Sequence, residues 1–226
     1  MRSVDRGERP KDNDGVDVVF KEYAWARRYL IDRIGEYCSY CERKIQASLA
    51  VEHVQPKDLV PELVLAWDNF LLACTNCNST KGDTAIMLSD YVWPDVDNTY
   101  ACFDYPPDGL VSVSEQVEDE MLKARVEKTI QLFGLAKKPP NDGTQNWQKA
   151  SDRRVEQRIK VLHYANQYSE LYHKADDSTR RLIVKLLLPI ALESGFWSIW
   201  AKAFEPFPEV FETLKAAFPG TRWPEK

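Results

Sequence analysis

The sequence predicts an α+β fold in which a small module built around two cysteine pairs is embedded in a predominantly helical protein. The pairs are Cys38-Ser-Tyr-Cys41 and Cys74-Thr-Asn-Cys77, and they lie in residues 36–83, where short apolar runs are broken by Cys, Pro and Asn. From about Ser114 onward, by contrast, apolar residues recur at helical spacing. The chemistry is therefore expected in the cysteine module, and the helices are expected to surround it.

Length, composition and charge limit the classes of function. The 226 residues with 44% hydrophobic content can form one compact domain, or a small catalytic module wrapped by helices. No apolar run is long enough to span a membrane and the first residues are charged, so a cytoplasmic protein without a membrane partner is expected. A net charge of -5 argues against binding nucleic acid by overall attraction. Any such contact must be local or helped by a partner.

The N-terminal third begins with a polar segment and a helix. Residues 1–16 are expected to be an ordinary frayed terminus, although their four cations would also suit a mobile arm that touches phosphate. From Val18 to Gly35 the apolar spacing predicts a helix, and Gly35 suits its end. Beyond the cysteine module, aromatic and β-branched residues around Pro106-Pro107-Asp108-Gly109 predict a short hairpin.

The remainder reads as a series of helices. Pro189 is expected to bend one of them or to end a turn, and a Pro- and Gly-containing break is expected at 138–144. The three expected parts are an N-terminal arm and helix at 1–35, the cysteine module with its flanking hairpin at 36–110, and a helical region at 111–226. The expected helical segments of the last part are 114–135, 151–175, 177–204 and 208–218.

The paired cysteines predict a structural zinc site. Zn²⁺ prefers four soft ligands in a tetrahedron, which two C-x-x-C turns supply. A thioredoxin-like redox role is the alternative for a single pair, but two pairs without a surrounding βαβ pattern favour zinc. Four thiolates leave no open coordination position, so this ion would hold the fold and perform no hydrolysis. Cys102 stands alone and is expected to be a small buried hydrophobic residue.

Polar residues between the cysteine pairs predict a one-metal phosphodiesterase site. His53 is the candidate general base, because its ordinary pKa near neutrality lets it take a proton from water. Glu52 and the side-chain carbonyl of Asn78 offer hard oxygens to a divalent cation such as Mg²⁺. Adjacent strand residues point to opposite faces, so Glu52 and His53 can serve one site only if the strand twists or ends there, and Pro56 makes an ending plausible.

Two further residues are candidates for supporting roles. The amide of Asn69 can hold the histidine-bearing loop by hydrogen bonds to its backbone, or it can simply shape a turn. Lys81, near the end of a short helix expected after Cys77, is placed either against a substrate phosphate or in solvent.

Taken together, the motifs C-x-x-C, E-H-x-x-P, W-D-N and C-x-x-C-N-x-x-K resemble the HNH, or ββα-metal, endonuclease family in its zinc-bearing form. The match covers about Tyr37 to Asp83. The resemblance implies a hairpin that carries the base His53, then a helix that carries the last metal ligand, here Asn78, with Glu52 as the ligand before the base and Asn69 as the middle residue. Asn78 stands where the family more commonly has His, and its side-chain oxygen suits Mg²⁺ or Mn²⁺. An inactive protein stays an alternative.

The order of these motifs, with a helical C-terminal half, is similar to the nuclease subunits of Septu anti-phage systems, the PtuB-like proteins. This resemblance implies DNA as substrate and a separate ABC-type ATPase subunit, PtuA-like, as partner. The sequence contains no G-x-x-x-x-G-K-[ST] phosphate loop, so any ATP dependence must come from the partner. The alternatives are a non-catalytic zinc module that binds nucleic acid or protein, and an RNA-cutting defence toxin.

Overall fold

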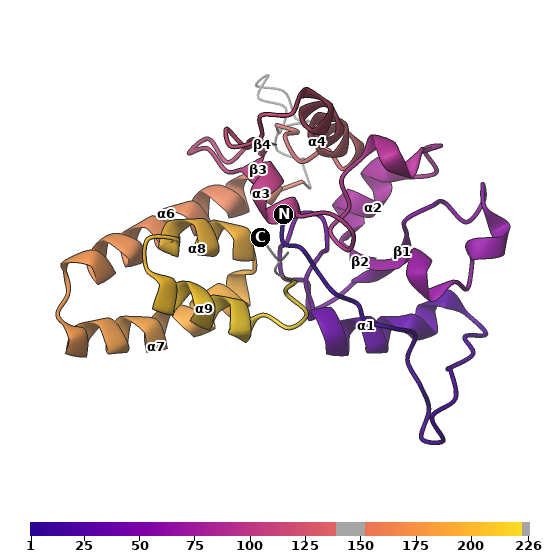
Figure 1. The fold of residues 1–226 in the computed structure, drawn as a ribbon, viewed down its shortest axis with the longest axis horizontal. Helices are drawn as coiled ribbons and strands as arrows, with labels where there is room; N and C mark the ends of the chain where they lie inside the picture. The colour runs from indigo at the N-terminus through magenta and orange to yellow at the C-terminus, as the bar shows by residue number, and fades with distance from the viewer. Residues whose placement is uncertain (139–151, 223–226) are drawn as a thin grey trace.

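The computed structural model describes residues 1–138 and 152–222, which form two lobes (Figure 1). The first lobe contains the cysteine module, and the second contains the C-terminal helices. Each has its own buried apolar cluster, although a few residues from the first half of the chain, such as Tyr100, pack into the second cluster. The predicted break at 138–144 lies almost wholly outside the described residues.

A two-stranded hairpin between two helices is the centre of the first lobe. Strands β1 (Ala50–His53) and β2 (Phe70–Ala73) are antiparallel, with Glu52 opposite Leu71 and His53 opposite Phe70. Helices α1 (Ala26–Ile34) and α2 (Thr75–Lys81) lie on either side of the strands (Figure 1). This arrangement explains why all four residues of β2 are apolar and buried. The hairpin and following helix that the resemblance implied are therefore present.

Helix α1 is shorter than the sequence predicted. A 3₁₀ turn, η1 (Tyr23–Trp25), precedes it, and residues before Tyr23 are not helical. The helix ends where predicted, because Gly35 adopts a φ of 77°. Cys74 is the N-cap of α2, because its sulfur accepts a hydrogen bond from the backbone N–H of Cys77, so the second cysteine pair also caps the helix.

Short elements complete the first lobe. The predicted hairpin is present as β3 (Phe103–Asp104) and β4 (Ser112–Val113), and Cys102 before it is buried as predicted. The apolar core continues into α4 through Val126 and Phe133, while the division of the chain at residues 110 and 111 stays a prediction. The remaining elements are η2 (Pro61–Leu63), η3 (Trp67–Asn69), η4 (Leu88–Asp90), α3 (Thr99–Cys102) and α4 (Glu120–Leu132).

Within residues 152–222, the second lobe consists of four helices, α6 (Arg154–Lys174), α7 (Asp177–Ser194), α8 (Trp197–Phe204) and α9 (Pro208–Ala217). Helix α7 continues through Pro189, so the proline does not end the helix. Gly195 lies against the first lobe with a φ of 69°, and a Cβ there would lie 2.5 Å from the carbonyl oxygen of Glu42. Only glycine therefore permits this close approach of the two lobes.

The predicted frayed N-terminus is wrong for residues 1–4, which are buried. The amino group of Met1 lies 3.2 Å from the carboxylate of Glu42, and Arg2 donates to the backbone carbonyls of Ile34 and Pro219 at 2.7 and 2.9 Å. Figure 1 accordingly shows the N-terminus near the junction of the lobes, and Val4 there forms an antiparallel bridge with Thr221. These partners lie far along the chain, so the local polarity of the segment gave no sign of them.

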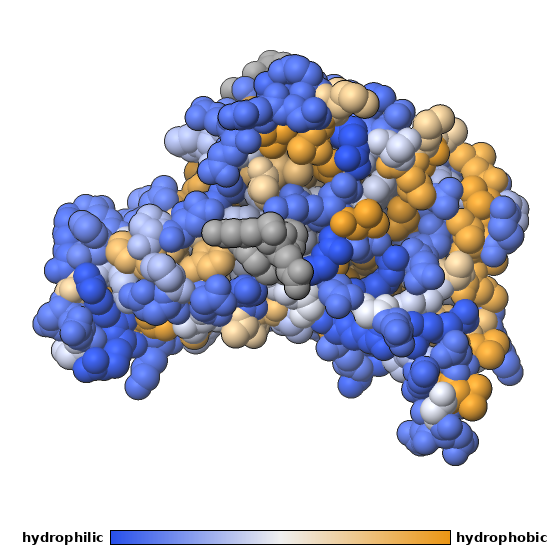
Figure 2. Space-filling view, viewed as in Figure 1, coloured by the Kyte–Doolittle hydropathy of each residue, from blue (hydrophilic) through white to orange (hydrophobic). Residues whose placement is uncertain are grey.

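The surface differs between the lobes. Figure 2 shows that apolar surface on this face gathers over the first lobe, whereas the helices of the second lobe present mostly hydrophilic residues. Within the described part of the chain, no helix combines the length and the apolar character that crossing a membrane requires.

Candidate active site and metal centre

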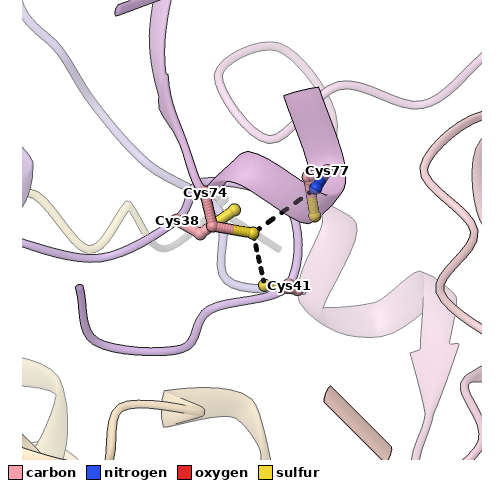
Figure 3. A group of neighbouring side chains, drawn as sticks. All are labelled: Cys38, Cys41, Cys74 and Cys77. Carbon is pink, nitrogen blue, oxygen red and sulfur yellow. Dashed lines mark hydrogen bonds between the residues drawn. The ribbon is translucent and has the colours of Figure 1, made fainter. Parts of the chain in front are cut away.

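The four paired cysteines come together at the start of α2 (Figure 3). All four are buried, none is in a disulfide, and their sulfur atoms all lie within 4.8 Å of one another. The sulfurs of Cys41 and Cys74 are 3.7 Å apart. Zn–S bonds of about 2.3 Å in a tetrahedron give sulfur separations of about 3.8 Å. The donor set and its spacing therefore fit a zinc ion, as the sequence predicted.

Two buried arginines of α6, Arg154 and Arg158, lie beside this cluster. Four thiolates around Zn²⁺ carry a net negative charge, which is costly to bury without compensation. The guanidinium of Arg154, only 1% exposed, donates to the sulfur of Cys77 at 3.2 Å and to the carbonyl oxygen of Phe133 at 2.8 Å. Arg158, one turn further along α6, is equally buried and donates to the carbonyl of Leu135 at 2.7 Å. Helix α6 of the second lobe is therefore fastened to the metal centre.

His53 ends β1 with its ring enclosed. The side chain is 7% exposed, and Nε2 lies 3.1 Å from the carbonyl oxygen of Val64. The rings of Tyr23 and Phe70 meet it edge to face, at centroid distances of 4.9 and 5.2 Å. Because a carbonyl only accepts, Nε2 carries the proton here, and the neutral ring keeps the lone pair of Nδ1 free. That is the state a general base requires.

Burial also lowers the pKa of His53 below its ordinary value, because a charged imidazolium loses solvation. The Val64 carbonyl, which favours the charged form, opposes this shift. Among nearby charges, Lys57 and Lys81 lower the pKa further and Asp58 raises it. The lowered pKa favours the neutral form of the histidine.

Glu52 faces the other side of the strand, where it meets α2. Its Oε1 lies 2.8 Å from the ammonium of Lys81, and the two side chains are 4% and 1% exposed. The same ammonium donates to the backbone carbonyl of His53 at 2.9 Å. Burial raises the pKa of Glu52 and the ammonium of Lys81 opposes that shift, while the exposed Asp83 adds to the rise.

The position of Lys81 differs from both sequence-based expectations, a phosphate contact and a solvated side chain. The lysine is held inside the protein because the last turn of α2 packs against β1, directly over Glu52. In this conformation its ammonium serves the carboxylate and the strand backbone rather than a ligand at the surface.

Asn69 makes the hydrogen bonds that the sequence analysis expected of it. Its Oδ1 accepts from the backbone N–H of Gln55 at 2.7 Å, and its Nδ2 donates to the carbonyl of the same residue at 2.9 Å. The backbone carbonyl of Asn69 accepts from Val54 at 2.9 Å. The loop after His53 is thus held from both sides, while the effect of this clamp on catalysis stays a prediction.

Asn78 lies one turn before Lys81 on α2 and therefore on the same side of the helix as that lysine. Its side chain is half-buried, and within the described residues its amide makes no hydrogen bond. The second carboxylate oxygen of Glu52 is likewise without a hydrogen-bond partner in that part of the chain. Glu52 and Asn78 can offer two oxygens to a cation, next to the ammonium that already balances the carboxylate.

Sequence reasoning missed several residues of this site. Tyr23 and Val64, which orient the histidine ring, come from a 3₁₀ turn and a loop that carry no motif. Lys57, in the loop after β1, places its ammonium 5.1 Å from the ring centroid of Tyr23. Its position directly after Pro56 of the E-H-x-x-P motif was the available signal.

Comparison with known proteins agrees with this geometry. Residues 38–84 match the HNH endonuclease family. The Septu protein PtuB of Bacillus thuringiensis is 34% identical over 80 residues, which cover 32% of this chain and 31% of that protein. The match thus spans about a third of the curated relative's length. Residues 38–84 therefore resemble an HNH endonuclease domain, and an 80-residue part of the chain is similar to PtuB.

Proposed function

We propose that this protein is a metal-dependent endonuclease that hydrolyses DNA phosphodiester bonds as the effector of an anti-phage defence system. The observation that carries the proposal is the geometry of His53 within the segment that matches the HNH endonuclease family. Its Nε2 is held by a backbone carbonyl, its Nδ1 makes no hydrogen bond within the described residues, and Asn69 fixes the loop that follows. The similarity to PtuB supports the defence role.

In the proposed reaction, His53 is the general base. A water molecule near Nδ1 attacks the phosphorus atom and transfers its proton to that nitrogen, while the bond to the leaving oxygen breaks. The Val64 carbonyl fixes the ring and stabilises the imidazolium that forms, because a second proton on the ring strengthens the donor at Nε2. Asn69 acts through the backbone and is a positioning residue.

Glu52 and Asn78 are the residues that would hold the catalytic cation, Mg²⁺ or Mn²⁺. A carboxylate and an amide oxygen are the ligands these ions prefer, with water and substrate phosphate in the other positions. When bound, the ion supplies stabilisation of the charge on the leaving oxygen. The structural zinc takes no part in this chemistry, since four thiolates fill its coordination.

DNA and an ABC-type ATPase subunit, PtuA-like, are the proposed partners. The chain itself is acidic and has no phosphate-binding loop of the G-x-x-x-x-G-K-[ST] type, so delivery to DNA by another subunit suits its composition. The similarity to a Septu protein supports this assembly.

A plasmid-nicking assay tests the proposed function. Wild type and His53→Ala are compared with Mg²⁺ or Mn²⁺, with and without a PtuA-like ATPase, and zinc content confirms that both are folded. We expect cutting by wild type that the variant loses. Cutting that persists in His53→Ala would exclude the histidine as base. No cutting of plasmid or of RNA under any condition would favour a non-catalytic zinc module, and cutting of RNA alone would favour a toxin.

A further inference from the structure

We propose that Lys57 is the residue that contacts substrate phosphate beside His53, the role that the sequence suggested for Lys81. This inference rests on the proposed function, because it names a substrate contact of the same site. Three observations support it. The backbone of the loop after β1 is held in place, Lys57 and His53 contact the same tyrosine ring, and Lys57 forms no ion pair within the described residues.

The backbone that carries Lys57 is held in place. Both backbone polar groups of Gln55 are bonded to the side chain of Asn69, at 2.7 and 2.9 Å. Pro56 is buried, and its carbonyl accepts from the N–H groups of Leu59 and Val60 at 3.0 Å. Lys57 therefore projects from a segment fixed on both sides, so little backbone freedom is lost when the lysine binds a ligand.

The ammonium of Lys57 and the ring of His53 contact the same tyrosine. Nζ lies 5.1 Å from the ring centroid of Tyr23, whose centroid is 4.9 Å from that of His53. The ammonium is thus within 10 Å of the base, and both lie on the face of the hairpin opposite Glu52. Successive phosphates of one DNA strand lie about 3.4 Å apart along the helix axis. A cation at this distance reaches the scissile phosphate or one of its neighbours.

The charge of Lys57 is also available. Within residues 1–138 and 152–222 it forms no ion pair, and its side chain is half-buried, so part of its conformational freedom is already lost. Lys81, in contrast, is paired with Glu52 inside the protein. For a chain with a net charge of -5, an unpaired cation beside the base is the kind of local contact that phosphate binding requires.

Salt-dependent DNA binding by the zinc-loaded, full-length protein tests this inference. The probes are a 30-base-pair duplex and a single-stranded RNA of the same sequence, without divalent cations, so that nothing is cut. We compare wild type with Lys57→Met, with Lys57→Arg, and with Lys185→Met as the matched control. Lys185 is exposed on α7 in the other lobe and, in the described structure, also forms no ion pair.

We expect Lys57→Met to weaken binding and to reduce the slope of log K against log salt by about 0.9, the loss of one phosphate contact. Lys57→Arg and Lys185→Met should keep the wild-type slope. An unchanged slope in Lys57→Met would overturn the inference and leave the lysine as a packing partner of Tyr23. Wild type that binds neither probe in a salt-dependent way would overturn it as well. The expected binding result here, together with no cutting in the plasmid-nicking assay, would by contrast count against the proposed nuclease only.

Discussion

Replacing Lys81 with methionine should destabilise the protein strongly, because it leaves a carboxylate buried without its partner. The Lys81 ammonium lies 2.8 Å from Glu52, the two side chains are 1% and 4% exposed, and methionine keeps much of the side-chain volume. Breaking a buried ion pair in this way costs about 3–5 kcal/mol. With a urea m-value of about 3 kcal/mol per M, the unfolding midpoint should fall by at least about 1 M.

The dependence on pH gives this prediction a second signature. Without the lysine, Glu52 keeps the effect of burial and the smaller effect of Asp83, both of which raise its folded-state pKa above the unfolded value. The folded state then binds a proton more tightly than the unfolded state does. Stability is therefore highest below the unfolded pKa and is lost as pH rises through the folded one. The deficit of Lys81→Met against wild type should be larger at pH 8 than at pH 5.

Two controls separate this effect from ordinary loss of a lysine. The double variant Glu52→Gln/Lys81→Met removes both charges and should recover more than half of the deficit. Lys57→Met removes a half-buried lysine without an ion pair in the described structure, and should change the unfolding free energy by less than about 1 kcal/mol. If Lys81→Met were as stable as Lys57→Met, and Glu52→Gln had no compensating effect, the buried pair would be refuted.

Three further predictions concern the rest of the site. Asn69→Ala removes two hydrogen bonds to the loop after His53, so it should lower the free energy of unfolding, measured in urea titrations, by about 2–4 kcal/mol. It should also lower the rate of single-turnover cleavage. If neither the unfolding free energy nor the cleavage rate changed, these hydrogen bonds would not hold the loop. The cleavage rate should rise with pH and level off with a midpoint below about 6.5, because His53 acts when neutral and burial lowers its pKa against the opposing Val64 carbonyl; a midpoint above 7 would exclude this assignment. Arg154→Ala should release zinc to a colorimetric chelator at least about tenfold faster than wild type, since it loses a charge-assisted bond to a thiolate, whereas the exposed Arg153→Ala should not; equal rates would refute the coupling.

Features that depend on neighbours along the chain were predictable from the sequence. A C-x-x-C turn places its own two sulfurs together, and the two turns needed only the intervening hairpin to meet. Helical spacing and Gly35 located the end of α1, and the Pro-Pro-Asp-Gly turn located the hairpin of β3 and β4. The hydrogen bonds of Asn69 could also be predicted, because its partner Gln55 lies only 14 positions away in the sequence.

Features that depend on how distant elements pack were not predictable. The interaction of Arg154 with Cys77 joins residues 77 positions apart, and nothing in the helical pattern of 151–175 distinguishes this arginine from the exposed Arg153 beside it. The burial of Lys81 likewise requires knowledge that the last turn of α2 lies over β1. A lysine near the end of a short helix is usually solvated, so local statistics favoured the wrong environment.

The alternation of side chains along β1 divides the site into two faces, and Lys81 connects them. Glu52 points toward α2 and the charged groups there, whereas the ring of His53 points toward Tyr23 and Val64. The ammonium of Lys81 bonds both the carboxylate of Glu52 and the backbone carbonyl of His53, so it ties the strand end that carries the base to the helix that carries Asn78. A substitution at Lys81 should therefore impair catalysis, because it would shift the proposed base His53 relative to the proposed cation ligands Glu52 and Asn78. Such a loss should appear in kcat, whereas loss of the phosphate contact at Lys57 should appear in the affinity for DNA.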